Sequence, residues 1–337
     1  MKEIKVAMIG FGGIARTHYA GYLNFQKEGT PIRLVAVCDI DSAKFDAPLK
    51  INIDGGKNTL DESIHRYTDV DSLIENEDFD MADICLPTYL HKEYSVKLLK
   101  AGKHVICEKP MALSGEECDE MLAASRESGK RLMIAQCLRF APEYLYLKDC
   151  VTDGRFGKLK NIFMERKSAQ PRWGFEHWFE KTDKCGGCIL DMHVHDVDMA
   201  RFLLGEPYAV SVLSYDDVVR WSVENSRLYY KDTMVVIDGS WDESATCRFR
   251  VGYRARFENA TVSSENGVVK VYPEKGEPFT PETPKLNIYG EEIRYFANTV
   301  MNDTENDRNP PESACATVKL IEKMRESADK NGEIIMI

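Results

Sequence analysis

The chain has 337 residues, of which 44 are basic and 55 are acidic, so its formal net charge is −11. This balance argues against a nucleic-acid partner, because a surface that binds phosphates must be basic. No apolar run approaches the roughly 20 residues that a membrane span requires. The length exceeds that of one ordinary α/β core and predicts two domains.

Cysteine usage indicates a reducing compartment. Many of the ten cysteines lie in apolar stretches such as Ile84-Cys85-Leu86. A free cysteine behaves as a small buried hydrophobe, so we favour reduced thiols over a disulfide framework. The first residues lack the basic-then-apolar layout of a secretory signal. We therefore expect a cytoplasmic protein without a membrane partner.

In the first third of the chain, short β-branched runs alternate with helical patterns. The runs are residues 4–9, 34–38, 82–86, 104–107 and 132–135, and the helical patterns include residues 92–100 and 115–127. Continuous apolar strands separated by helices are typical of a parallel sheet covered on both faces. Right-handed crossovers then predict an α/β domain with a doubly wound Rossmann sheet.

Beyond about residue 150 the predicted strands are longer and alternate in polarity. They are residues 158–166, 209–219, 233–241, 246–257 and 333–337; the predicted helices are 189–204, 289–301 and 312–329. Asn266-Gly267 is typical of a hairpin turn. Successive strands without intervening helices predict an α+β domain with a large, open, mostly antiparallel sheet. We expect a dinucleotide-binding domain at residues 1–122 and a substrate-binding and oligomerisation domain at 123–337.

The pattern Gly10-x-Gly12-x-x-Ala15 follows a predicted strand and opens a predicted helix. Glycine at position 10 permits a tight turn, and Gly12 lets the backbone approach a pyrophosphate. The helix N-terminus supplies unpaired N–H groups to the anion. A plain strand-to-helix turn would also use glycines, but the flanking elements favour a dinucleotide loop.

An acidic residue ends the second predicted strand, where Asp39 follows Cys38. Its carboxylate would accept hydrogen bonds from the adenosine ribose hydroxyls and repel a 2′-phosphate. Ile40 and Asp41 follow without an arginine, so NAD is favoured over NADP. The alternative is that Asp39 caps a helix.

Three further stretches carry a family resemblance. Residues 84–91 resemble the "TPxxxH" end of a fourth strand, residues 102–110 resemble "GKHVxxEKP", and residues 186–198 resemble "GGxxxDxxxHxxD". Together they look like the glucose–fructose oxidoreductase and inositol dehydrogenase family, and the resemblance spans essentially the whole chain. The stretch between Asp39 and Tyr67 is longer than usual and includes residues 53–57.

The resemblance implies hydride exchange between NAD(P) and a sugar, polyol or related hydroxy compound, in a homodimer or homotetramer formed through the C-terminal sheet. It implies Lys109, Asp191 and His195 as catalytic residues. The expected cofactor site comprises Gly10, Phe11, Gly12, Gly13, Ile14, Asp39, Pro87, Thr88, His91, Glu108 and Lys109. The expected substrate site comprises Lys109, Arg166, Trp173, Trp178, Asp191 and His195.

The chemistry is also consistent with the residues themselves. Lys109 ends a predicted parallel strand, at the edge where ligands of such sheets bind, and can hold a substrate hydroxyl. His195 is the better base, since histidine titrates near pH 6.5. Asp191 lies four residues earlier and shares its face on a helix, where it can contact substrate or lysine or orient the imidazole. Asp198 lies near that face or is simply solvated.

Two other patterns have alternative interpretations. Cys185-x-x-Cys188 with His193 and His195 resembles a zinc site, but it overlaps the dehydrogenase motif, and we expect no metal. The aromatic residues 173–179 suit either stacking on a sugar or packing under the domain. Two rival functions also stay open: an NAD-dependent glycosidase that oxidises its sugar transiently, and a dinucleotide-binding sensor without catalysis.

Overall fold

The computed structural model describes residues 3–46 and 59–337 of the chain. It divides into two compact units. The first unit comprises Met1–Ala112, Glu116–Cys137 and Asn287–Cys315, and the second comprises Leu113–Gly115, Leu138–Leu286 and Ala316–Ile337. The first unit thus takes in a late segment from the range that we assigned to the second domain. Residues 53–57 lie outside the described part of the chain.

The first unit contains a parallel six-stranded sheet in the order β3-β2-β1-β4-β5-β6, which confirms the predicted Rossmann fold. The strands are β1 (Ile4–Ile9), β2 (Ile32–Cys38), β3 (His65–Tyr67), β4 (Met81–Ile84), β5 (His104–Glu108) and β6 (Leu132–Ala135). The helices are α1 (Gly13–Glu28), α2 (Val70–Asn76), α3 (His91–Lys100), α4 (Gly115–Ser128) and α9 (Ile288–Asn302), with the 3-10 turns η1 (Ser42–Phe45) and η2 (Thr88–Leu90). The strand order reverses between β1 and β4, and ligands of such sheets bind at the carboxyl ends of these strands.

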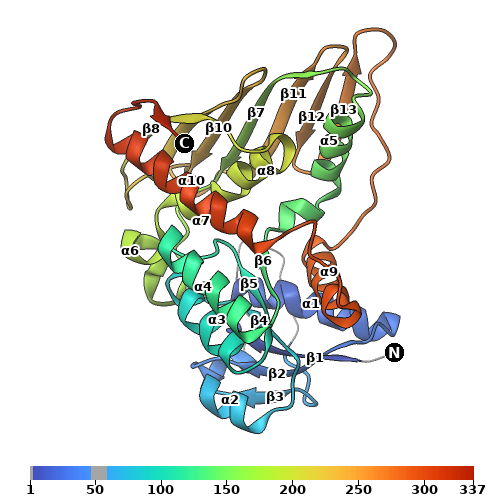
Figure 1. The fold of residues 1–337 in the computed structure, drawn as a ribbon, viewed down its shortest axis with the longest axis vertical. Helices are drawn as coiled ribbons and strands as arrows, with labels where there is room; N and C mark the ends of the chain where they lie inside the picture. Colours follow the sequence, from blue (N-terminus) through green and yellow to red (C-terminus); the bar gives the residue numbers. More distant parts are fainter. Residues whose placement is uncertain (1–2, 47–58) are drawn as a thin grey trace. The chain divides into compact units, whose positions relative to one another are not determined.

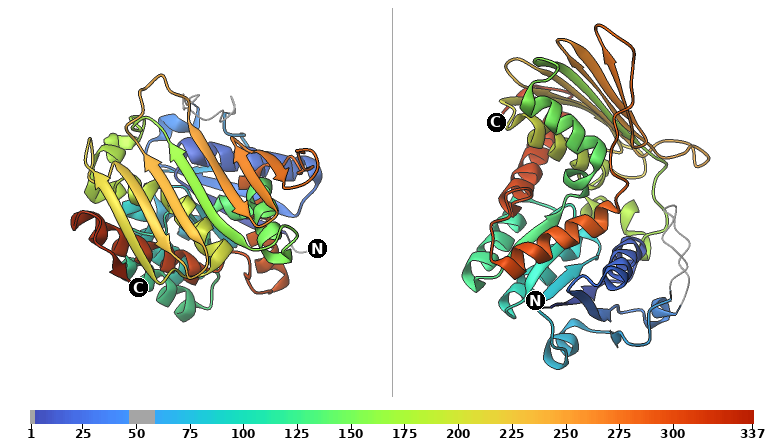
Figure 2. Two further views of the ribbon diagram at one scale, coloured as in Figure 1. Left: turned by 90° about the horizontal axis from the view of Figure 1, so that it is seen from above. Right: turned by 90° about the vertical axis from the view of Figure 1, so that its right-hand side faces the viewer.

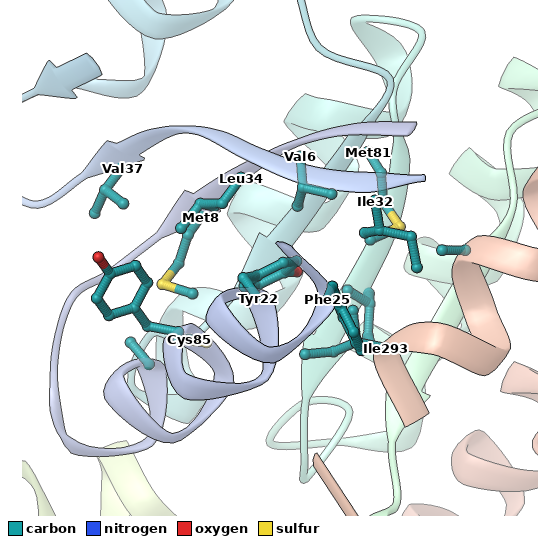
Figure 3. Packing of buried hydrophobic residues seen from close by; sticks show 14 of the residues in the cluster. Val6, Met8, Tyr22, Phe25, Ile32, Leu34, Val37, Met81, Cys85 and Ile293 are labelled. Atoms are coloured by element: carbon teal, nitrogen blue, oxygen red, sulfur yellow. The ribbon is translucent and has the colours of Figure 1, made fainter. Parts of the chain in front are cut away.

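Helices α1 and α9 cover one face of this sheet, and α3 and α4 lie on the other (Figure 1). Figure 3 shows Tyr22 and Phe25 of α1 beside Met8 of β1 and Ile293 of α9. All four side chains are buried. Removing this apolar surface from water stabilises the layer by roughly 25 cal/mol per Å².

The second unit contains an eight-stranded sheet in the order β13-β12-β11-β7-β10-β9-β8-β14. Its strands are β7 (Leu159–Lys167), β8 (Ala209–Tyr215), β9 (Val223–Tyr229), β10 (Met234–Ser240), β11 (Arg250–Phe257), β12 (Ala260–Glu265), β13 (Val268–Pro273) and β14 (Ile335–Met336). All neighbours are antiparallel except β7 and β10. The helices lie behind the sheet in the left view of Figure 2, whose near face is open. These features confirm the predicted open, mostly antiparallel sheet.

The helices of the second unit are α5 (Pro142–Asp153), α6 (Thr182–Cys185), α7 (Cys188–Asp191), α8 (Val194–Leu204) and α10 (Pro311–Asp329), the last of which begins in the first unit. The 3-10 turns are η3 (Cys137–Phe140) and η4 (Phe175–Glu180). Our prediction of one helix over residues 189–204 is wrong. The helix is interrupted at Met192 and His193, where the His193 N–H donates to the Cys188 carbonyl, five residues back.

All ten cysteines are free thiols, and only Cys247 among them is exposed. Among the helices formed by residues 3–46 and 59–337, none combines the length and apolarity that a membrane crossing needs.

Candidate active site

The glycine loop after β1 has the form that a pyrophosphate needs. Gly10 has φ +89°, and a Cβ there would lie 2.6 Å from the Cys85 carbonyl oxygen, so only glycine lets β1 and β4 approach this closely. A Cβ on Gly12 would meet no atom within 4 Å. No side chain caps α1, and no acidic residue lies in its first turn. The space beside Gly12 and the uncapped helix therefore fit a bound anion.

Asp39 follows β2 and is buried. Its Oδ2 accepts the Phe11 N–H at 2.7 Å, its Oδ1 accepts the Asp41 N–H at 2.9 Å, and the Lys44 ammonium contacts both oxygens. The helix-capping alternative applies to Asp41, which accepts the Ala43 N–H at the start of η1. Asp39 thus ties the end of β2 to the glycine loop.

Lys44 is a residue that the sequence did not single out. Its Nζ lies 2.9 Å from Asp39 Oδ1, and its carbonyl accepts from the Arg16 guanidinium at 2.6 Å. Two basic residues therefore lie close to the carboxylate that we assigned to the ribose. A short 3-10 turn, which periodicity does not reveal, brings Lys44 back to Asp39.

Polar side chains gather where β4 and β5 end. His91 is buried, and its ring nitrogens lie 2.7 Å from the Pro110 carbonyl and 2.8 Å from the Leu86 carbonyl. Burial lowers the pKa of His91, although both carbonyls favour the charged ring. The two contacts of His91 therefore connect the loop that carries Pro87 with the loop that follows Lys109.

Two buried polar groups at this edge have no hydrogen-bond partner among the described residues. They are the Thr88 hydroxyl, at the start of η2, and the Gln136 amide nitrogen, which directly follows β6. A buried polar group without a partner is costly, so each is a candidate ligand for the cofactor. Thr88 was predicted from the sequence, whereas Gln136 was not.

Glu108 and Lys109 lie at the carboxyl end of β5. Glu108 Oε2 accepts the backbone N–H of Lys109 at 3.0 Å, and Oε1 lies 3.0 Å from His18 Nε2. The Glu108 carboxylate is buried, whereas the Lys109 side chain is partly exposed. The predicted position of Lys109 at a strand end is therefore confirmed within the first unit.

Asp191 and His195 belong to the second unit. Asp191 ends α7 and is buried, whereas His195 lies in the first turn of α8 and is partly exposed. Because the interruption between α7 and α8 changes their register, their common face no longer follows from the four-residue spacing.

Arg166 and Asp198 have partners inside the second unit. The Arg166 guanidinium donates to Asp196 at 2.8 and 3.1 Å and to the Tyr144 hydroxyl at 3.3 Å. Asp198 is buried and accepts two hydrogen bonds from Arg139, both at 2.8 Å. These contacts favour structural roles for both residues, and Asp198 is not a solvated surface group.

The residues of the zinc-like string make separate contacts. The Cys185 thiol accepts the Gly187 N–H, and His193 Nε2 lies 3.0 Å from the Ser226 hydroxyl. Cys188 lies against Glu224, a fully buried acid of β9 that the sequence did not single out. In the described residues, the metal-ligand clusters lie elsewhere and share His18.

The burial of His193 predicts a pH effect on stability. Burial lowers the pKa of His193 to about 4, so the native ring stays neutral while the unfolded ring takes up a proton near pH 6.5. Stability contributed by this site is therefore lost as the pH falls from about 6.5 to 4, by about 3 kcal/mol in total. We expect His193→Gln, which keeps a donor toward Ser226, to lack this loss. Urea unfolding of both proteins across this range measures the difference, and a pH-independent difference would contradict the assignment.

The aromatic segment around η4 has two exposed rings, Trp173 and Phe175, and a buried stack. Trp173 is 45% exposed, whereas Trp178 is 9% exposed and stacks on Phe179 with ring centroids 3.9 Å apart. Glu176 and His177 both have positive φ, a strained backbone for residues with side chains. Trp173 is thus available to a ligand, whereas Trp178 packs beneath the segment.

Comparisons with known proteins agree with this arrangement. Residues 4–136 match a family described as "Oxidoreductase family, NAD-binding Rossmann fold". Residues 144–294 match the "GFO/IDH/MocA C-terminal domain".

Two relatives illustrate the range of similar sequences. A 2,7-anhydro-N-acetylneuraminate hydratase of Mediterraneibacter gnavus is 31% identical over 61% of this chain and 50% of its own length. Levoglucosan dehydrogenase of Pseudarthrobacter phenanthrenivorans is 28% identical over 63% of this chain and 54% of its own. The match thus spans about half the length of these relatives.

Among solved structures, an aldose-aldose oxidoreductase from Caulobacter crescentus, complexed with glycerol, is similar with a TM-score of 0.83. The match covers 100% of both chains at 21% identity, so the likeness concerns the fold. The two matches over residues 4–136 and 144–294 lead to one conclusion. The chain belongs to the GFO/IDH/MocA family of oxidoreductases.

Proposed function

We propose that the chain is an NAD-dependent oxidoreductase that moves a hydride between nicotinamide and a carbinol carbon of a sugar, polyol or related hydroxy compound. The observation that carries this proposal is the open space beside Gly12 at the uncapped start of α1. The relatives named as dehydrogenases support the substrate class, including a myo-inositol 2-dehydrogenase of Thermotoga maritima.

The chain's own residues supply binding, orientation and proton transfer. The bound nicotinamide supplies the hydride acceptor. We assign Lys109 to hold the reacting hydroxyl and stabilise its developing negative charge, and His195 to take up the hydroxyl proton. Asp191 either binds the substrate or orients one of these groups. Each turnover then breaks one C–H and one O–H bond, and the proton passes from the base to solvent.

The aromatic segment supports a sugar or polyol ligand. Trp173 presents a partly exposed ring, and aromatic faces bind the C–H faces of sugars while they exclude water. The Lys181 ammonium donates to the carbonyl of the strained residue Glu176 at 2.9 Å, and the ring of His177 lies 3.0 Å from Glu180. We therefore place Trp173 in the substrate site and give Trp178 a supporting role.

We further propose that Asp39 makes NAD the preferred cofactor. Replacing Asp39 by Asn keeps an acceptor for the Phe11 N–H but removes the charge that repels a 2′-phosphate, and Lys44 remains to attract it. We expect NAD affinity to fall by roughly tenfold and NADP affinity to rise, because a hydrogen bond to a charged group contributes about 1.5–3 kcal/mol. Titration of both dinucleotides measures this, with Asp41→Asn as the matched control. An unchanged ratio of the two affinities would refute the ribose contact.

The direct test of the function is a screen for NAD reduction. Purified protein is mixed with NAD and with inositols, free hexoses or glycosides, and NADH formation is followed by absorbance. We expect stoichiometric NADH from at least one inositol or free sugar. If NAD protects the protein against thermal unfolding but no compound is ever oxidised, the sensor interpretation replaces ours.

The alternative enzyme oxidises its substrate transiently and returns the hydride. One observation favours this alternative: the relative from Mediterraneibacter gnavus is named a hydratase rather than a dehydrogenase. Such an enzyme would convert a glycoside or anhydro sugar without net NADH. Product analysis of the same screen distinguishes the two activities.

We also propose a cytoplasmic homodimer or homotetramer. Free thiols fit a reducing compartment, and the open sheet presents exposed Phe163, Leu213 and Met234 from three of its strands. Exposed apolar side chains of this size gather at protein interfaces. Sedimentation equilibrium measures the oligomeric state, and charged substitutions at Leu213 and Met234 should shift it toward the monomer.

A further inference from the structure

A buried cluster of ionisable groups lies on the face of the first sheet that α1 and α9 cover. His18 of α1 is fully buried between Asp83 of β4 and Glu108 of β5. Asp83 lies opposite Ile106 in the register of these strands, and alternation places Glu108 on the same face. Glu292 of α9 completes the group from the opposite side, with an oxygen 4.0 Å from His18 Nε2.

Hydrogen bonds join three of these groups in a line that ends at Lys109. His18 Nδ1 lies 3.0 and 3.1 Å from the Asp83 oxygens, and His18 Nε2 lies 3.0 Å from Glu108 Oε1. The other oxygen of Glu108 accepts the Lys109 N–H at 3.0 Å. Tyr22 donates to Asp83 at the far end. Glu108 is thus held by His18 on one side and holds the backbone of Lys109 on the other.

Both nitrogens of His18 face carboxylates, so both must carry protons to donate. Burial opposes the charged ring, but Asp83 and Cys85 outweigh it and raise the pKa of His18 well above its ordinary value. The same atoms have the spacing of a metal site. In the hydrogen-bonded arrangement, however, both ring nitrogens of His18 serve as donors to carboxylates rather than as lone-pair ligands.

Glu292 lies in the same cluster but outside the line. Its side chain is fully buried, and neither oxygen has a hydrogen-bond partner among the described residues. Burial and then the charge of Glu108 raise the pKa of Glu292 well above its ordinary value, which favours the neutral acid. Glutamine at this position keeps the size of that side chain and carries no charge.

We propose that His18 is a positioning residue, which acts through the Glu108 carboxylate to fix the end of β5 and thereby the point from which the Lys109 side chain extends. This inference rests on the proposed function, because it gives Lys109 its role. It adds His18, a buried residue of α1, to the residues that the sequence predicted for this site. A shift of about 1 Å in a reacting group can lower turnover by about 10²-fold.

Two substitutions separate the two ends of the His18 ring. In His18→Gln the amide nitrogen replaces Nε2 and still reaches Glu108, whereas in His18→Asn it replaces Nδ1 and reaches Asp83 instead. We expect His18→Asn to lower kcat by about tenfold or more, and His18→Gln to keep kcat within about threefold of wild type. NAD affinity should stay within about twofold in both. A purely structural role would lower both melting temperatures alike and leave kcat unchanged below them, which would overturn the proposal.

Two nearly isosteric substitutions, Glu108→Gln and Glu292→Gln, test the proposal even if the His18 variants do not fold. We expect Glu108→Gln to lower kcat by about tenfold or more, and Glu292→Gln to keep kcat within about twofold of wild type. Where His18→Asn folds, combining it with Glu108→Gln should lower kcat no further, because both act through one contact. Two results would contradict the proposed role of the contact between His18 and Glu108. One is an equal loss of kcat in Glu108→Gln and Glu292→Gln, and the other is an additive loss of kcat in the double variant.

The control for the proposed function is Lys109→Ala, measured in the same assay. If Lys109→Ala retains wild-type turnover, the role of Lys109 is wrong. If Lys109→Ala is inactive while Glu108→Gln retains wild-type turnover, only the positioning role of His18 fails.

Discussion

Replacing Lys109 or His195 by alanine should lower turnover by a factor on the order of 10² or more. Lys109 lies at the end of β5 with its backbone held by Glu108, and His195 lies in the first turn of α8 with its side chain partly exposed. The first variant loses the group that holds the substrate hydroxyl, and the second loses the group that takes its proton. Steady-state kinetics with the substrate found in the screen measures the effect.

Cofactor binding should survive in both variants, because the glycine loop and Asp39 remain intact. The matched controls are Lys100→Ala, at the end of α3, and His65→Ala, on β3; both side chains are exposed. Both controls should keep wild-type turnover. Near-wild-type turnover in Lys109→Ala or His195→Ala would show that the role assigned to that residue is wrong.

Replacing Asp198 by alanine should lower the free energy of unfolding by about 3–5 kcal/mol. Asp198 and Arg139 are both buried and form two hydrogen bonds of 2.8 Å, and Thr317 donates a third at 3.0 Å. Removing the carboxylate leaves the Arg139 guanidinium buried without its compensating charge. Urea unfolding followed by far-UV circular dichroism measures the loss.

Asp46→Ala provides the control for this prediction. Asp46 pairs with Arg66 at 3.0 Å, but its side chain is 72% exposed and that of Arg66 is 35% exposed, so its removal should cost less than about 1 kcal/mol. Equal losses in Asp198→Ala and Asp46→Ala would contradict the view that burial makes the Arg139 pair important.

The sequence predicted those parts of the fold in which side-chain period and local turn chemistry agree. Residues 4–9 and 132–135 form β1 and β6 with the predicted bounds. Asn266 and Gly267, both with positive φ, join β12 to β13 as a two-residue hairpin. In each case the apolar period or the turn residues determine the structure locally.

Strand β9 was not predicted, because its buried positions are partly polar. A strand is recognised in a sequence when its buried positions are apolar. In β9 the buried positions are Glu224, Ser226 and Leu228, and only Leu228 is apolar. The interruption between α7 and α8 was also missed, since residues 189–204 are apolar enough for one continuous helix. Tertiary packing determines both features, and a single sequence carries no signal for it.

The sequence predicted the individual residues of the candidate site but not the contacts that support them. Lys44 reaches Asp39 through a short turn, and His18 reaches Glu108 from a helix 90 positions earlier. The turn η1 sets the first contact, and the packing of α1 against β4 and β5 sets the second, which spacing along the chain does not encode. The motifs predicted that Asp39 and Glu108 lie at strand ends, and the structure shows the side chains that contact them.

The most direct test of the account follows the hydride itself. A substrate from the screen is labelled with deuterium at its carbinol carbon, and the NADH and sugar products are analysed by mass spectrometry. Our account predicts that the deuterium appears in NADH and is absent from the oxidised product. Deuterium retained in a product that forms without net NADH, or no transfer at all from any substrate that binds, would contradict it.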